Sequence, residues 1–238
     1  MTSAIYAFND AQDAPQDREH PVKRHRPVAG GNITVRAARA WGVLLFVVGV
    51  LLVSMTGSAA AVGITLAYAA LNLMYSLGAK NVALLDVFIL SSGFVLRVLL
   101  GCALTMVVPS SWLLLCSYSL ALFLALIKRR ADLKQGLGNE ARPSLSGYTL
   151  GFLDAAAAIS AGMTLIAYAS YCMEAEVLIA GREFAALPFV VFGVLDYLRV
   201  AHLKDEGGSP VDLILGSPAL LAAGVGWAIA TLWSLGQP

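Results

Sequence analysis

Long apolar segments, separated by short polar ones, make up most of this chain. A segment of roughly 18 or more apolar residues is long enough to cross a bilayer as a helix. Seven segments fit that description, at about residues 35–55, 59–77, 85–106, 110–128, 149–172, 185–201 and 217–236. The pattern predicts an all-α protein, a polytopic bundle of membrane-spanning helices.

The polar segments between these spans alternate in charge. Residues 9–34, 78–84, 128–148 and 202–216 carry most of the charge, and of the sixteen Lys and Arg residues only Arg182 falls in the other set of loops. Cytoplasmic loops carry an excess of Lys and Arg. We therefore expect the first set to face the cytoplasm, in a multi-pass protein of the inner (plasma) membrane.

Composition agrees with a membrane protein and narrows the function. Hydrophobic residues make up 58% of the chain and charged residues 13%, whereas soluble domains have about 25% charged residues. A net charge of +1 gives no reason to expect a nucleic-acid partner. The three cysteines are widely spaced, which indicates neither a metal site nor a disulfide framework.

Near the N-terminus, residues 9–31 form an unusual polar stretch that begins with acids. Asp10, Asp13 and Asp17 stand at i, i+3 and i+7, so on a helix they share one face, with Asn9 beside them. Carboxylates this close repel each other unless a cation lies between them. Hard oxygen ligands without His or Cys suit Mg²⁺, which commonly bridges carboxylates to a substrate phosphate.

Bases follow the acids directly. Lys23, Arg24 and Arg26 are spaced over four residues, and such side chains bind phosphate oxygens. The stretch as a whole predicts a site for Mg²⁺ and a diphosphate. The alternative is a solvated acidic turn followed by a positively charged flank of the first predicted span.

The third predicted span contains two charged residues. Asp86 and Arg97 are eleven residues apart, close to three helical turns, so they lie on one stripe with Gly93 and Gly101. An arginine inside a span normally faces the bundle interior or a wet cavity. Arg97 either pairs with an acid or carbonyl of another helix or binds phosphate. Asp86 is either a helix N-terminal acid or a functional one.

A basic triplet opens the loop predicted for residues 128–148. Lys128, Arg129 and Arg130 either anchor the topology or bind phosphate, and Asp132 follows them. Asp154 lies near the start of the next span and needs a partner there, for which one of these cations is the natural candidate.

The remaining polar positions are interpreted as structural. Asp196 and Arg199 stand at i and i+3 in the sixth span and can pair locally. His20, His25 and His202 are expected to be isolated surface residues without a metal role.

Residues 9–27 resemble the first signature of the UbiA superfamily of intramembrane prenyltransferases. The signature is Asn-Asp-x-x-Asp-x-x-x-Asp followed by His-Pro-x-Lys-x-x-Arg-Pro, and each specified position matches. Members have nine transmembrane helices, with this motif at the cytoplasmic end of the second. The resemblance implies that residues 1–238 are a single UbiA-like domain with seven of nine helices, lacking the first and most of the second.

Other segments resemble the decaprenyl-phosphate phosphoribosyltransferase branch of that superfamily. Ordinary prenyltransferases carry a second motif, Asp-x-x-x-Asp, between the sixth and seventh helices, where this chain has Lys-Arg-Arg-Ala-Asp with one early acid. The likeness to the branch lies in residues 75–80, 85–87, 91–97, 128–132 and 207–210.

This resemblance implies a reaction. Members of the branch transfer 5-phosphoribose from phosphoribosyl diphosphate to a polyprenyl phosphate, such as decaprenyl phosphate, and release diphosphate. It implies that Asp10, Asp13 and Asp17 are catalytic and hold Mg²⁺ on the cytoplasmic side. The implied substrate-binding residues are Asn9, Lys23, Arg26, Tyr75, Lys80, Arg97, Lys128 and Arg129.

Two other functions remain as alternatives. One is an ordinary prenyltransferase with a degenerate second motif, which would move a prenyl group from prenyl diphosphate to an aromatic or lipid acceptor. The other is a small membrane transporter, which Asp86, Arg97 and Asp154 within the spans would suit. Transport sites usually lie near the midplane between internal repeats, whereas these charges gather at one face and no repeat is visible.

Overall fold

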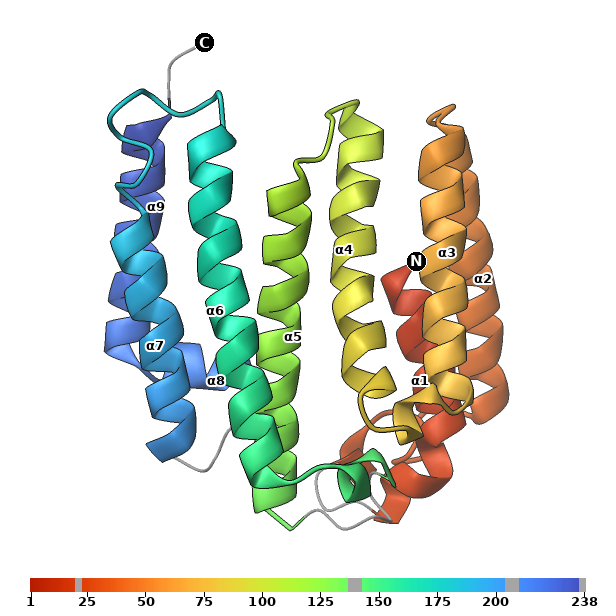
Figure 1. The fold of residues 1–238 in the computed structure, drawn as a ribbon. Coiled ribbons are helices and arrows are strands. Elements are labelled where there is room, and N and C mark those ends of the chain that lie inside the picture. Colours follow the sequence, from red (N-terminus) through yellow and green to blue (C-terminus); the bar gives the residue numbers. More distant parts are fainter. Residues whose placement is uncertain (20–22, 137–142, 204–209, 236–238) are drawn as a thin grey trace. The chain divides into compact units, whose positions relative to one another are not determined.

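A computed structural model describes residues 1–19, 23–136, 143–203 and 210–235. In this part of the chain the secondary structure is helical, apart from one isolated β-bridge between Leu178 and Leu235 (Figure 1). Five of the described helices are long and apolar enough to cross a membrane. The prediction of an all-α membrane protein is therefore confirmed.

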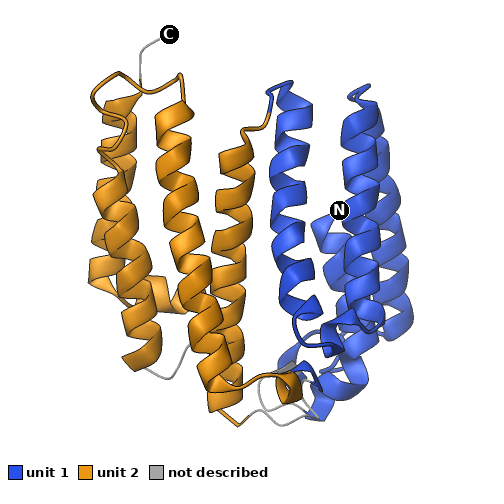
Figure 2. Ribbon diagram, viewed as in Figure 1, with its two compact units in different colours: residues 1–108, 139–144 blue, residues 109–138, 145–238 orange. Residues whose placement is uncertain are grey.

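The chain divides into two compact units (Figure 2). Unit 1 contains residues 1–108 and 139–144, and unit 2 contains residues 109–138 and 145–238. The helices of unit 1 are α1 (Thr2–Glu19), α2 (Val35–Ser54), α3 (Ala59–Leu77) and α4 (Leu85–Thr105), with short 3₁₀ turns η1 (Lys23–His25) and η2 (Ala79–Asn81). Those of unit 2 are α5 (Ser111–Lys134), α6 (Leu150–Glu174), α7 (Leu187–Leu203), α8 (Pro210–Leu215) and α9 (Pro218–Ser234), and the turn η3 (Pro143–Gly147) lies at the boundary of the two units.

The predicted spans match seven of these helices closely, with one important difference. Helix α5 continues to Lys134, so the triplet that begins at Lys128 is helical and the prediction that it lies in a loop is wrong. Ala, Leu, Lys and Arg are strong helix formers, and an Arg129–Asp132 pair at i, i+3 supports the last turns. The count of seven spans is not confirmed, because α7 and α9 have 17 residues each.

Side-chain caps fix where several membrane helices begin. The hydroxyl oxygens of Thr34, Ser58 and Thr149 accept hydrogen bonds from backbone N–H groups three residues on, each at 3.2 Å. Such caps satisfy N–H groups that have no partner within the helix. They start α2, α3 and α6 at positions that the local sequence specifies.

Small residues bring α1 close to α2. Ala11 and Ala14 are buried on α1, in a cluster with Val28 and Ala38. A β-carbon on Gly42 of α2 would lie 3.0 Å from the ring of Phe8, which is tighter than ordinary van der Waals contact. Close packing against α2 therefore holds α1 in place and with it the three acids of the predicted site.

Candidate functional site

Helix α1 carries the predicted acid cluster. Asp10, Asp13 and Asp17 all lie within its regular turns, which confirms that they occupy a helix. Asp17 is only 4% exposed, while Asp10 and Asp13 are half-buried. A buried carboxylate needs a cation or hydrogen-bond donors around it, so the partners of these acids define the site.

Arg26 bridges two of the three acids. Its Nη1 donates to Asp10 Oδ1 at 3.1 Å and to Asp17 Oδ2 at 2.9 Å. The backbone here is fixed by a tight turn, in which the Arg26 carbonyl accepts from Gly30 N at 2.7 Å. One guanidinium thus balances two carboxylates that are seven residues apart on α1.

Lys80 supplies the partner of the third acid. Its ammonium group, in η2, forms an ion pair with Asp13. One turn earlier, at the end of α3, the Ser76 hydroxyl contacts the side-chain oxygen of Asn9. The structure therefore brings Lys80 of η2 and Ser76 of α3 against the helix that carries the acids.

The donor chemistry of this cluster fits Mg²⁺. Mg²⁺ takes oxygen ligands and usually needs only one or two carboxylates, completing its shell with water and phosphate. Within the described residues, no three His, Cys, Asp or Glu side chains gather closely enough to hold a metal by themselves. In this arrangement Arg26 and Lys80 form ion pairs with the acids.

A second feature of unit 1 is a cavity of about 170 Å³ next to Asn9. Arg97 of α4 lies at its wall and donates from Nη2 to the Tyr68 hydroxyl at 2.6 Å. The guanidinium also lies over the rings of Tyr68 and Phe94, 5.3 and 5.1 Å from their centroids. Tyr75, another predicted site residue, lines the same cavity.

The structural alternative for Arg97 was a pair with an acid or a carbonyl of another helix. Within the described residues it contacts neither, and its partners are Tyr68 and Phe94.

Asp86, in contrast, is fully buried and accepts hydrogen bonds within unit 1. Its Oδ1 accepts from Val87 N at 2.9 Å and its Oδ2 from the Ser144 hydroxyl at 3.0 Å.

Unit 2 holds the basic triplet. Arg129 is 1% exposed, and its Nη1 donates to Asp132 Oδ2 at 3.0 Å. Arg130 Nε donates to Asp154 Oδ1 at 2.5 Å, which confirms the prediction that a cation of the triplet pairs with Asp154. Lys128 is exposed.

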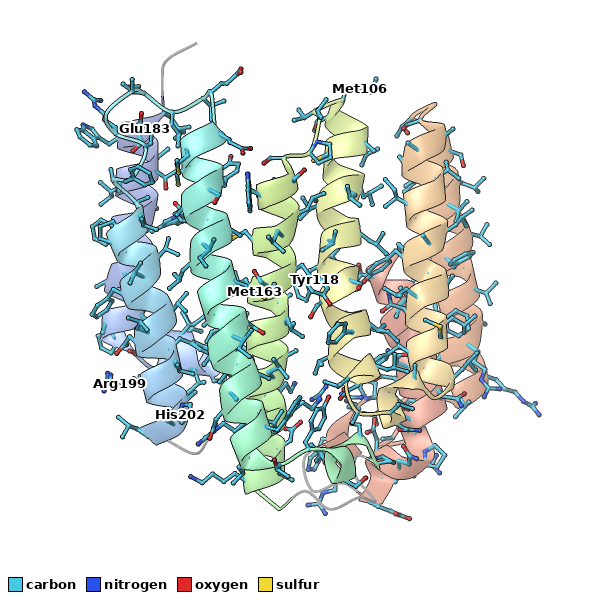
Figure 3. The ribbon with its side chains drawn as sticks, viewed as in Figure 1. Met106, Tyr118, Met163, Glu183, Arg199 and His202 are labelled. Carbon is cyan, nitrogen blue, oxygen red and sulfur yellow. The ribbon has the colours of Figure 1, made fainter. Side chains whose placement is uncertain are left out.

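The interpretation of His202 as an isolated surface residue is wrong. Its Nε2 lies 3.1 Å from Asp154 Oδ1, and its Nδ1 lies 2.7 Å from the Leu198 carbonyl oxygen. Figure 3 labels His202 near the end of α7, together with Arg199. Arg199 confirms its predicted local pair, since Nη2 lies 2.6 Å from Asp196 Oδ1. The sequence gave no signal for the contact between His202 and Asp154, because the two residues lie 48 positions apart on different helices.

Two residues at the site were missed from the sequence. Tyr68 and Asn72 line the cavity with Arg97, and they precede Ser76 at four-residue steps along α3. That spacing places them near one another on a helix and was the signal that could have found them. Lys23 and His20 were named from the sequence, but the Lys23 side chain and the whole of His20 lie outside the described residues.

Comparisons with known proteins identify the family. The model of the UbiA prenyltransferase family matches residues 1–207. A decaprenyl-phosphate phosphoribosyltransferase from Corynebacterium glutamicum is 32% identical, over 98% of this chain and 72% of that protein. One from Mycobacterium tuberculosis is also 32% identical, over 97% of this chain and 76% of that protein.

Solved structures agree on the fold. A UbiA homolog from Archaeoglobus fulgidus, determined bound to GPP and Mg²⁺, superposes with a TM-score of 0.74 at 16% identity. The superposition covers 96% of this chain and 82% of that one. The chain therefore belongs to the UbiA prenyltransferase family and is an integral membrane transferase.

Proposed function

We propose that this protein transfers 5-phosphoribose from phosphoribosyl diphosphate to a polyprenyl phosphate, such as decaprenyl phosphate, and releases diphosphate. The main support is the likeness, over nearly the whole chain, to two relatives named for that transfer. The charges of the chain also suit it. One acid-rich site lies in unit 1, and the helix end of unit 2 has bases where a second acidic motif would be expected.

The acid cluster is proposed to be the donor site. Asp10, Asp13 and Asp17 would hold Mg²⁺, which when bound would stabilise negative charge on the departing diphosphate. Arg26 is paired with two of these acids and can turn to phosphate oxygens, for which arginine is a suitable donor. Lys23 and Asn9 would bind the donor beside them.

The transfer itself needs little acid–base chemistry. The bond between C1 of ribose and the diphosphate oxygen breaks, and its electron pair leaves with the diphosphate. A phosphate oxygen of the lipid forms the new bond to C1, which has oxocarbenium character as the old bond breaks. Because that oxygen is already anionic, the protein needs no strong general base. Its task is to position two anions and to balance their charge.

The other phosphates need cations or hydroxyl groups. We propose that Tyr75, Lys80, Arg97, Lys128 and Arg129 bind the lipid phosphate or the 5-phosphate of the sugar. Arg129 is buried and donates a hydrogen bond to Asp132. It would therefore bind a phosphate while Asp132 holds its guanidinium in position. We also propose that the acid cluster faces the cytoplasm, since the loops on its side carry the excess of Lys and Arg.

A competition between labelled donors tests the proposal. Membranes containing the protein are incubated with polyprenyl phosphate, Mg²⁺ and either labelled phosphoribosyl diphosphate or labelled prenyl diphosphate. We expect label to enter the lipid fraction only from the sugar donor, and only when Mg²⁺ is present. Label from prenyl diphosphate in an aromatic or lipid acceptor would replace the proposal with ordinary prenyl transfer.

A further inference from the structure

A polar track leads from the acid cluster into the membrane part of unit 1. Lys80 and Ser76 contact Asp13 and Asn9 at one end of the track. The Ser76 hydroxyl lies 2.9 Å from the Asn72 carbonyl, and Asn72 Nδ2 donates to the Tyr68 carbonyl at 2.7 Å. Polar side chains at four-residue steps on an apolar helix form a continuous polar surface.

Arg97 lies at the deep end of this track. It is the thirteenth residue of α4, about 18 Å along the helix at 1.5 Å per residue, in a bilayer whose hydrocarbon core is about 30 Å thick. Tyr68, its hydrogen-bond partner, is the tenth residue of α3. Arg97 is therefore near the middle of the membrane-spanning region, and the expectation that it gathers with the other charges at one face is wrong.

The charge of Arg97 is not balanced within the described residues. None of the Asp and Glu side chains described pairs with it, and its contacts are the Tyr68 hydroxyl and two aromatic rings. Its side chain is also exposed. A charged group at this depth is costly unless it faces water, an opposite charge or a polar ligand. A guanidinium in these surroundings is suited to bind an anion.

The cavity at Arg97 is small and borders the acid motif at Asn9. Its volume of about 170 Å³ corresponds to roughly five or six water molecules. That space suits a compact polar group rather than an isoprenoid chain. Asn9, which directly precedes the first acid, lines the cavity together with Asn72, Tyr68 and Arg97.

We propose that Arg97, with Tyr68 and Asn72, binds the 5-phosphate of the sugar donor. This inference rests on the proposed phosphoribosyl transfer, in which the protein binds both the 5-phosphate of the sugar and the phosphate of the lipid. It assigns the first of these two groups to Arg97. One donor molecule carries a diphosphate and a 5-phosphate at its two ends. The acid cluster lies at one end of the polar track and Arg97 at the other, and Asn9, next to the first acid, lines the cavity at Arg97. These two charged sites match the two ends of the donor. The lipid phosphate would bring its chain into a space too small for it.

Kinetics with Arg97→Gln tests this assignment. We expect the KM for phosphoribosyl diphosphate to rise about 10- to 100-fold, which corresponds to the loss of one charge-assisted hydrogen bond. The KM for polyprenyl phosphate should stay within about twofold. Tyr68→Phe, which removes the hydroxyl that holds the guanidinium, should raise the KM for the sugar donor by a smaller factor. Arg39→Gln, which removes an exposed arginine of α2 in the same unit, is the matched control.

A binding measurement separates this inference from the proposed reaction. Ribose 5-phosphate, which lacks the diphosphate, should raise the melting temperature of the detergent-solubilised wild-type and Arg39→Gln proteins, whereas ribose should not. Arg97→Gln should lose that shift while melting as a single folded species without ligand. An unchanged shift in Arg97→Gln, or a rise only in the KM for the lipid, would overturn the assignment. If the wild-type protein transfers no phosphoribose at all, the proposed function fails instead.

Discussion

Units 1 and 2 both contain charged side chains at the ends and within their membrane helices, but they balance them differently. In unit 2 three arginines each have one carboxylate partner. Arg129 pairs with Asp132, Arg130 with Asp154, and Arg199 with Asp196. In unit 1 a single guanidinium serves two acids, and Arg97 contacts no acid among the described residues. The two units therefore put similar residues to different uses.

The cavities differ in the same sense. Unit 2 has an apolar cavity of about 490 Å³ between its helices, lined mainly by Leu, Val, Phe and Trp side chains. The cavity at Arg97 in unit 1 is smaller, and its lining combines amide, hydroxyl and guanidinium groups with apolar side chains. Charges that are already neutralised add rigidity, whereas charges that lack a full partner can bind a ligand. The comparison predicts that substitutions at the acid cluster of unit 1 affect turnover, whereas loss of the Arg130–Asp154 pair of unit 2 affects stability.

The largest effect is expected at Asp13. Asp13→Asn keeps the shape of the side chain but removes a charge that balances Lys80 and that we propose to hold Mg²⁺. We expect Mg²⁺-dependent release of diphosphate to fall at least about 100-fold, with little change in melting temperature. Glu176→Gln, in an exposed loop, is the control. If Asp13→Asn retained turnover, Asp13 would not be a site residue. The proposed difference between a catalytic unit 1 and a structural cluster in unit 2 would then be weaker.

An intermediate effect is expected at Asp154, where the substitution should lower stability rather than turnover. Asp154→Asn leaves the guanidinium of Arg130, whose side chain is only 10% exposed, without its carboxylate. Breaking such a pair costs about 3 kcal/mol in the free energy of unfolding, so the melting temperature in detergent should fall by several degrees. The KM values for both substrates should stay unchanged. A selective rise in one KM would show instead that Asp154 takes part in binding that substrate.

The smallest effect is expected at Glu183, in the loop between α6 and α7 (Figure 3). Hydrogen bonds from the backbone N–H groups of Glu183 and Gly181 lower the pKa of its carboxyl group. The ionised form is therefore favoured in the folded state, and its contribution to stability is lost as the pH falls through the lowered pKa. Wild type should melt slightly higher than Glu183→Gln near neutral pH, and the difference should disappear as the pH falls below the lowered pKa of Glu183. A difference that persisted there would have another origin.

Much of the fold and part of the site could be predicted from sequence. The starts of α2, α3 and α6 coincide with Thr34, Ser58 and Thr149, because a cap and an apolar run are local signals. The pair Asp196–Arg199 was also expected, as was a pairing of Asp154 with one of the cations of the triplet. The error at α5 came from interpreting charge as a loop signal, although Lys and Arg are strong helix formers.

The sequence alone determined that this is a helical membrane protein with three aspartates on one face of a helix, because apolar length and residue spacing decide both. Only the tertiary structure decided which cation meets which acid. Lys80 is 67 residues from Asp13, and His202 is 48 residues from Asp154. It also decided that Arg129 is buried and Arg97 is not. Helical periodicity specifies the face on which a side chain lies, whereas its partner depends on which other helix packs against that face.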